Sequence, residues 1–371
     1  MDIKKYQDEV YPLIKELCKI PAPSHFEDER AKFCKDWFIN AGFTSVYIDE
    51  AKNVVCEYNA KNSNELTVFA AHTDTVFPDT TPYPFKEEGN RAYCMGISDD
   101  TASVAVMMIS AKYLLDNNLI PEKGMLFVCN SCEEGLGDLK GTRNLMKNYA
   151  GRIKRFISYD SSISAFYTEC VGSHRYNVKV ETTGGHSFSN FGRENAISNL
   201  ANMISEIYKI EVPKIGDSHT TYNVGIVNGG TSVNTIAQSA EMLCEYRSDN
   251  VECLAIMQEK FQNIFKNAEK EDVKITITKV GDRPCAKGVD PKKLDELLTT
   301  CKNVYEKIAN VKIAYHSGST DCNMPMSLGI PSVAVGVRTG GGVHTREEFL
   351  DIDSLPLGFE LSINLMQQFL K

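Results

Sequence analysis

Residues 127–138, FVCNSCEEGLGD, join an apolar run to two adjacent glutamates, Glu133 and Glu134. Neighbouring carboxylates repel each other, and each resists leaving water. They must therefore either lie in solvent or be held by strong positive charge. The apolar run 125–130 has the length and composition of a buried strand. Whether the glutamates are solvated or paired depends on which residues the chain brings to the end of this strand.

Apolar strands alternate with helices over most of the chain. This alternation predicts an α/β fold with a mostly parallel sheet that helices cover on both faces. Strands are expected at 66–71, 125–130, 155–159 and 332–337, and helices at 99–116, 291–309 and 352–370. A further helix is expected to begin with a capping box formed by Ser24 and Glu27.

The middle of the chain has a different order of elements. Residues 173–283 predict β-α-β-β-α-β, a split βαβ (ferredoxin-like) unit that is compact by itself. We therefore expect an α+β domain inserted into the α/β domain. The α/β domain is then discontinuous, with segments 1–172 and 284–371.

Charge and hydropathy narrow the class of protein. The net charge is −9 without a long basic run, which argues against a nucleic-acid groove or a polybasic membrane patch. The first twenty residues resemble an amphipathic helix and not a signal peptide. The longest apolar stretch, 103–111, is too short to span a bilayer. We expect a cytoplasmic protein.

Twelve cysteines are scattered through the chain, and we expect them to be reduced and buried. Cys129 and Cys132 have the Cys-x-x-Cys spacing of redox motifs. Since Cys129 lies inside a predicted strand, packing in the core is favoured over redox chemistry or metal binding.

Residues of metal-ligand type follow four of the predicted strands and open one predicted helix. In open α/β sheets, sites form outside the carboxyl ends of the strands. A histidine or carboxylate at one strand end is usually structural, but so many at one edge predict a site for two zinc or related divalent ions, about 3.5–4 Å apart. The residues are His72, Asp74, Glu133, Glu134, Asp160, His344 and, at the helix start, Asp99.

Six short stretches resemble the M20 metallopeptidases: HTDTV, GISDDTASV, SCEEGLGD, SYDSS, GGHSFSN and GGVHTREE. The resemblance covers nearly the whole chain and is strongest to peptidase T-like sequences, the tripeptide aminopeptidase branch. It implies a zinc-hydrolase catalytic domain, here 1–172 and 284–371, with an inserted lid and dimerisation domain at 173–283. One departure is Thr101, where family members often have lysine after the bridging aspartate and its neighbour.

The resemblance also implies a role for each residue at the predicted metal centre. His72 and Asp160 would bind one zinc ion, Glu134 and His344 the other, and Asp99 both; cobalt and manganese are alternatives to zinc. Asp74 would accept a hydrogen bond from His72 and fix its tautomer. Glu133 would act as general base toward the water shared by the metals.

In the inserted domain the resemblance points to three residues. His186 would reach the active site of a neighbouring subunit and stabilise the oxyanion, which requires a homodimer. Asn234 and Arg247 would bind the substrate, although an ion pair of Arg247 with Asp249 or another nearby acid is an equal alternative. Asp321 lies near the site without a definite role. The remaining histidines, at positions 25, 174, 219 and 316, are expected to be structural or at the surface.

The predicted function is hydrolysis of the N-terminal peptide bond of short peptides. It depends on Asp160, because in the family an aspartate at this position resembles the aminopeptidase and dipeptidase branch. The alternative on the same scaffold is an N-acyl amino acid deacylase or a carboxypeptidase. Two other classes are a non-catalytic zinc- or peptide-binding protein and a thiol enzyme that uses Cys129 or Cys132.

Overall fold

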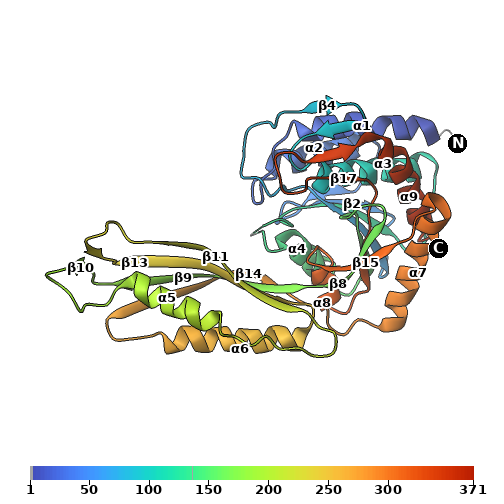
Figure 1. Cartoon of the computed structure of the whole chain (residues 1–371). Coiled ribbons are helices and arrows are strands. Elements are labelled where there is room, and N and C mark those ends of the chain that lie inside the picture. Colours follow the sequence, from blue (N-terminus) through green and yellow to red (C-terminus); the bar gives the residue numbers. More distant parts are fainter. Residues whose placement is uncertain (1–2, 136) are drawn as a thin grey trace. The chain divides into compact units, whose positions relative to one another are not determined.

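The computed structural model describes residues 3–135 and 137–371, which form two compact units (Figure 1). The first unit comprises the chain up to residue 170 together with 287–371, and the second comprises 171–286. The segment predicted to be inserted, 173–283, lies within the second unit.

An eight-stranded sheet forms the centre of the first unit, in the order β1-β2-β6-β3-β7-β16-β8-β15. The four neighbours β6, β3, β7 and β16 are parallel, so their carboxyl ends share one edge of the sheet. The predicted α/β fold is confirmed. The strands are β1 (Val46–Ile48), β2 (Val54–Tyr58), β3 (Leu66–His72), β6 (Met125–Asn130), β7 (Ile153–Ser158), β8 (Ala165–Cys170), β15 (Ala314–Gly318) and β16 (Ser332–Ala334).

Helices of the first unit pack on this sheet and on one another. Within this group α3 contacts β3 and β6, and it also packs against α1 and α9. Its many Ala, Val and Met side chains are almost all buried, as expected of a helix that is apolar on all sides. The helices are α1 (Ile3–Cys18), α2 (Asp28–Asn40), α3 (Ala102–Asp116), α4 (Lys140–Asn148), α7 (Pro291–Ala309), α8 (Asn323–Ser327) and α9 (Leu355–Gln367). No described helix is both long and apolar enough to cross a membrane.

Two helix starts differ from the prediction. The helix expected from Asp99 begins only at Ala102, because Asp99 and Asp100 have non-helical dihedral angles and the peptide bond between them is cis. They lie in a short irregular turn, η1 (Ile97–Thr101). The predicted capping box is wrong as well. Helix α2 follows Glu27 without a side-chain cap, and the Ser24 hydroxyl donates instead to a distant carboxylate, described below.

A small sheet joins two loops that are distant in the sequence. Its order is β17-β18-β5-β4, with β4 (Lys86–Glu88), β5 (Arg91–Tyr93), β17 (Gly340–Gly341) and β18 (Phe349–Asp351). The pairing of β5 with β18 brings the loop before α3 beside the loop that carries His344.

The second unit is an antiparallel sheet in the order β11-β13-β9-β14, with α5 and α6 packed against β9 and β13 (Figure 1). This is the predicted split βαβ arrangement. Its elements are β9 (Gly172–Thr182), α5 (Ala196–Ile207), β11 (Thr220–Gly229), β13 (Ser239–Ser248), α6 (Val251–Asn267) and β14 (Val273–Arg283). Two further short strands, β10 (Gly185–His186) and β12 (Thr235–Ile236), pair with each other.

Candidate metal centre

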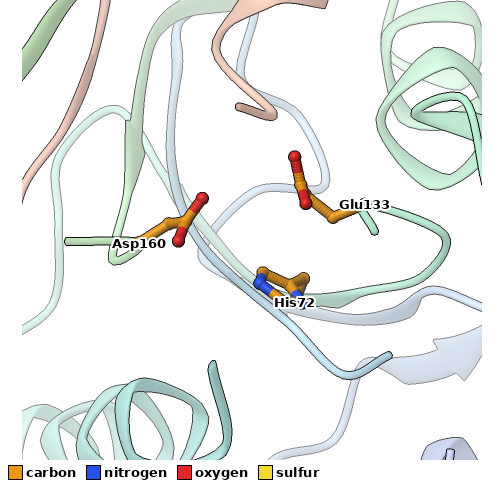
Figure 2. A group of neighbouring side chains, drawn as sticks. All are labelled: His72, Glu133 and Asp160. Atoms are coloured by element: carbon orange, nitrogen blue, oxygen red, sulfur yellow. The ribbon is translucent and has the colours of Figure 1, made fainter. Parts of the chain in front are cut away.

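Two of the predicted ligands and the predicted general base meet at the carboxyl edge of the parallel strands. His72 is the last residue of β3, Glu133 follows β6, and Asp160 follows β7 by two residues. One potential ligand atom from each lies within 4.8 Å of the others. Figure 2 shows the carboxylates of Glu133 and Asp160 on either side of the His72 imidazole. The strand ends thus bring together side chains that are far apart in the sequence.

Asp99 lies between two imidazoles. Its Oδ1 is 3.0 Å from Nε2 of His72, and its Oδ2 is 3.3 Å from Nε2 of His344. The same nitrogen of His344 is 3.1 Å from Oε1 of Glu134. A carboxylate whose two oxygens face different histidines has the arrangement of a ligand shared by two cations.

Asp74 orients both the histidine and the two glutamates. The Nδ1 atom of His72 lies 3.0 Å from the backbone oxygen of Asp74 and 3.5 Å from its Oδ1, so the nearer acceptor is the carbonyl. The carboxylate accepts hydrogen bonds from the amides of Glu133 and Glu134, each at 2.9 Å, and from the Ser24 hydroxyl at 2.6 Å. Nδ1 is thereby engaged, which leaves Nε2 of His72 to face Asp99.

Burial and neighbouring charges shift the pKa values of the clustered side chains in opposite directions. Burial raises the pKa of Asp100 and of Asp160 well above the usual range. Although burial opposes it, hydrogen bonds from His344 and His72 hold the pKa of Asp99 well below that range. Hydrogen bonds to Asp99 and Glu134 raise the pKa of His344 to about 10. The histidines and carboxylates stabilise each other's charged forms, as expected where acidic groups crowd a buried site.

The donor set fits a pair of divalent cations. Atoms bound to one zinc ion at about 2.0–2.2 Å lie roughly 3–4 Å from each other, and the separations of 3.0, 3.1 and 3.3 Å fall in that range. Oδ1 of Asp100 is buried and finds no hydrogen-bond partner among the described residues. Imidazole and carboxylate ligands suit zinc, cobalt and manganese. Such charge would also let the adjacent glutamates, both nearly buried, remain ionised.

Glu348 holds the loop of Asp99, a role that the sequence analysis missed. Its carboxylate accepts hydrogen bonds from the amides of Gly96, Ser98 and Asp99, each at 2.8 Å. Burial and the neighbouring Asp99 raise the pKa of Glu348 to about 7 against the opposing effect of these amides. Glu348 lies four residues after His344, so one loop supplies a candidate ligand and positions another.

Asp321 is held by hydrogen bonds inside the first unit. It is buried and accepts hydrogen bonds from Asn130 at the end of β6 and from Thr142 in α4. It therefore anchors the strand from which Glu133 and Glu134 follow.

The structure places the three predicted lid residues at two positions in the second unit. His186 pairs with Thr235 across the β10–β12 ribbon, next to Asn234. Arg247 lies near the far end of β13, eight residues from Ser239, or about 26 Å at 3.3 Å per residue. There it forms an ion pair with Glu245, with Nε 2.8 Å from Oε1. Arg247 thus forms the ion pair given as the alternative, with Glu245 in place of Asp249. Substrate binding by Arg247 and Asn234 stays a prediction.

The two cysteines with Cys-x-x-Cys spacing are poor nucleophiles. Cys129 is fully buried in β6, and burial raises its pKa well above the usual value. Burial and the nearby Glu27 raise the pKa of Cys132 to about 12. A thiolate would be scarce at neutral pH, which argues against a thiol enzyme.

The sequence profile of peptidase family M20/M25/M40 matches residues 68–368, which include every candidate ligand. The chain belongs to this family. Among curated proteins, this M20 chain is 25% identical to the uncharacterized protein YqjE of Bacillus subtilis (strain 168), over 96% of the chain and 97% of YqjE. It is 24% identical to carboxypeptidase G2 of Pseudomonas sp. (strain RS-16), over 88% of the chain and 80% of that protein.

Solved structures share the fold along the whole M20 chain. The aminopeptidase PepT from Bacillus cereus ATCC 10987 has a TM-score of 0.75 at 21% identity, covering 98% of this chain and 99% of PepT. The YXEP protein of Bacillus subtilis, described as a dinuclear metal-binding peptidase of the M20 family, has a TM-score of 0.67 at 16% identity, covering 99% of each chain. The chain therefore has the M20 peptidase fold with catalytic and lid domains.

Proposed function

We propose that this M20 hydrolase is a metallo-aminopeptidase that uses two divalent metal ions, zinc in the first instance, to cleave the N-terminal peptide bond of short peptides. The observation that carries the proposal is Asp99, whose two oxygens face His72 and His344. Aspartate at position 160 and the likeness to PepT favour the aminopeptidase branch over the others.

The residues around Asp99 divide into two ligand sets. His72 and Asp160 would hold one cation, Glu134 and His344 the other, and Asp99 both. When bound, such cations polarise a substrate carbonyl and lower the pKa of a water molecule toward about 7. Asp74 supports both sets, because it orients His72 and holds the amide of Glu134.

Glu133 is the proposed general base. Its amide is fixed by Asp74, and its carboxylate reaches the group formed with His72 and Asp160. From there it takes a proton from the attacking water and passes it to the leaving nitrogen. The two adjacent glutamates thereby have different tasks: Glu134 binds metal and Glu133 transfers the proton.

His186 is suited to donate a hydrogen bond. Its Nδ1 lies 3.2 Å from the amide nitrogen of Phe188 and 3.4 Å from that of Ser189, so Nδ1 acts as the acceptor. The proton of the neutral imidazole then resides on Nε2, and the side chain is exposed. We propose that this Nε2–H stabilises the oxyanion in the active site of a second copy, as part of a cytoplasmic homodimer. Sedimentation of a fully active monomer would contradict that role.

The similarity to carboxypeptidase G2 supports a second candidate, an N-acyl amino acid deacylase or carboxypeptidase. One assay separates the two. The metal-loaded protein is given a tripeptide, its N-acetylated form and an N-acyl amino acid, and the release of free amino acid is measured. The aminopeptidase proposal expects cleavage of the free-amine tripeptide and little of the blocked substrates. Cleavage of only the blocked substrates would refute it and favour the second candidate.

A further inference from the structure

Arg338 is a buried cation without a hydrogen-bond partner. The residue is 5% exposed, and its Nε is buried without a hydrogen bond. Within residues 3–135 and 137–371, its side chain forms neither a hydrogen bond nor a salt bridge. Because burial of an unpaired charge is strongly unfavourable, a guanidinium in this state calls for an anionic partner.

Two loops fix Arg338 beside the candidate metal centre. Its backbone bridges to Ser162, two residues after Asp160, and its carbonyl accepts a hydrogen bond from Ile163 at 3.1 Å. Two residues further along, Gly340 approaches the turn of Asp99 so closely that a Cβ there would lie 2.6 Å from Oγ of Ser98. Arg338 therefore lies between the segments that carry two candidate ligands.

The positive charge of Arg338 acts on the carboxylates of the cluster, although no hydrogen bond or ion pair joins it to them. It contributes to lowering the pKa of Asp99, and it acts in the same direction on Asp100, where burial dominates. If Arg338 served to neutralise these carboxylates, an ion pair with one of them would be expected. Its terminal nitrogens instead remain available for another oxygen ligand.

Tyr167 in β8 supplies a second donor in the same region. Its hydroxyl forms no hydrogen bond within the described part of the chain. Tyr167 pairs with Ala334 of β16, four residues before Arg338, so β8 runs beside the strand that leads into the Arg338 loop. Burial raises the pKa of the Tyr167 hydroxyl. The ring is held by close packing, since a Cβ at Gly318 would lie 2.5 Å from its Cδ1.

We propose that Arg338 and Tyr167 form an anion subsite that binds a carboxylate of the substrate at the Asp160 side of the metal centre. A planar guanidinium with a neighbouring hydroxyl suits the two oxygens of a carboxylate. The assignment of this carboxylate to a short peptide depends on the proposed peptidase function. In such a peptide it is either the C-terminal carboxylate or that of an acidic side chain.

Matched acid and amide substrates test the subsite and distinguish the two sources. One pair is Ala-Ala-Ala and its C-terminal amide; the other is Glu-Ala-Ala-amide and Gln-Ala-Ala-amide. The zinc-loaded protein is expected to prefer the acid by about 10- to 100-fold in kcat/KM in one of the pairs. Arg338→Met should reduce that preference to near one, with the amide still hydrolysed and two zinc ions still bound. Tyr167→Phe should reduce it several-fold.

The control is Arg346→Met, since Arg346 is on the same loop, is 65% exposed and pairs with Asp79. It should leave the acid preference unchanged. Equal losses for acid and amide in Arg338→Met, together with lost zinc, would show that Arg338 only neutralises the cluster and would overturn the proposal. So would a wild-type protein without acid preference in either pair.

Binding gives a readout that does not require turnover. Calorimetry of the zinc-loaded protein with the same four peptides should show tighter binding of the acid in one pair, and Arg338→Met should abolish the difference. This result would support the subsite even if the protein cleaves no peptide and the proposed function fails. Equal binding of acid and amide by the wild type would overturn the subsite itself.

Discussion

Replacing Glu348 by glutamine should weaken metal binding although Glu348 is not a proposed ligand. In the structure one carboxylate oxygen accepts from the amides of Ser98 and Asp99, and the other accepts from Gly96, all at 2.8 Å. Glutamine has a single acceptor oxygen, so its NH₂ group must face at least one of these amides. That amide is buried and would lose its partner.

The expected magnitude follows from this count. A buried amide without a partner costs about 1–3 kcal/mol, and the bonds that remain lose their charge. If this free energy is lost from the metal-binding position of Asp99, the affinity of the shared metal site falls by roughly 5- to 150-fold. This range agrees with the 10- to 100-fold typical of residues that orient ligands. The assay is zinc competition with a chelator at pH 7, with circular dichroism to verify that the variant is folded.

The control is Glu347→Gln, which removes the same charge from the neighbouring exposed residue. It should retain the wild-type zinc affinity. If folded Glu348→Gln binds zinc as tightly as the wild type, the three hydrogen bonds do not position Asp99 and the reasoning is refuted.

The remaining predictions concern the base, one ligand, the lid and acid stability. Glu133→Gln should retain two metal ions per chain by elemental analysis and lose about 10²–10⁴-fold in turnover; near-normal turnover would remove it as the base. His72→Ala should bind fewer metal ions, and full stoichiometry would contradict its role as a ligand. His186→Ala should keep its metals and lose about 10²–10³-fold in kcat, whereas an unchanged kcat would exclude oxyanion stabilisation. A hydrogen bond from His174 holds the pKa of Asp282 well below its usual range. The ionised carboxylate therefore stabilises the fold at pH values above its unfolded pKa of about 3.9, and this stabilisation is lost as the pH falls. Asp282→Asn should therefore lower the melting temperature at pH 7 by no more than about 2 °C, because the Asp282 side chain is half exposed, with a smaller difference below pH 4. A difference that grows toward acid would be inconsistent with this.

The convergence at the metal centre was predictable because it depends on strand order alone. Parallel neighbours end at one edge, so residues directly after β3, β6 and β7 must come close whatever the loops do. The partners of Ser24 and Glu348 could not be predicted in this way. Ser24 binds Asp74, 50 residues away, and Glu348 binds the amide of Asp99 across 249 residues. Local sequence favoured a capping box for the first and gave no signal for the second.

The helix start at Asp99 shows the same limit. The apolar residues after position 101 correctly predicted α3, but two aspartates before them also suit a helix N-terminus. The amide of Asp99 is instead bound by Glu348, which holds the turn outside the helix. Because side chains alternate between the two faces of a strand, the sequence places both Glu245 and Asp249 on the same face as Arg247. Because β13 ends at Ser248, only Glu245 is presented beside it, while Asp249 accepts from the amide of His219.

The position of Asp74 limits how this active site can diverge. The buried carboxylate of Asp74 anchors the backbone of Glu133, the proposed base, and of Glu134, a proposed metal ligand. The backbone carbonyl of the same residue orients the ring of His72, a second proposed ligand. A substitution that moved Asp74 would displace all three at once. Changes of substrate preference between related chains should therefore accumulate around the anchor, in loops such as that of Arg338, while the anchor itself is inherited intact.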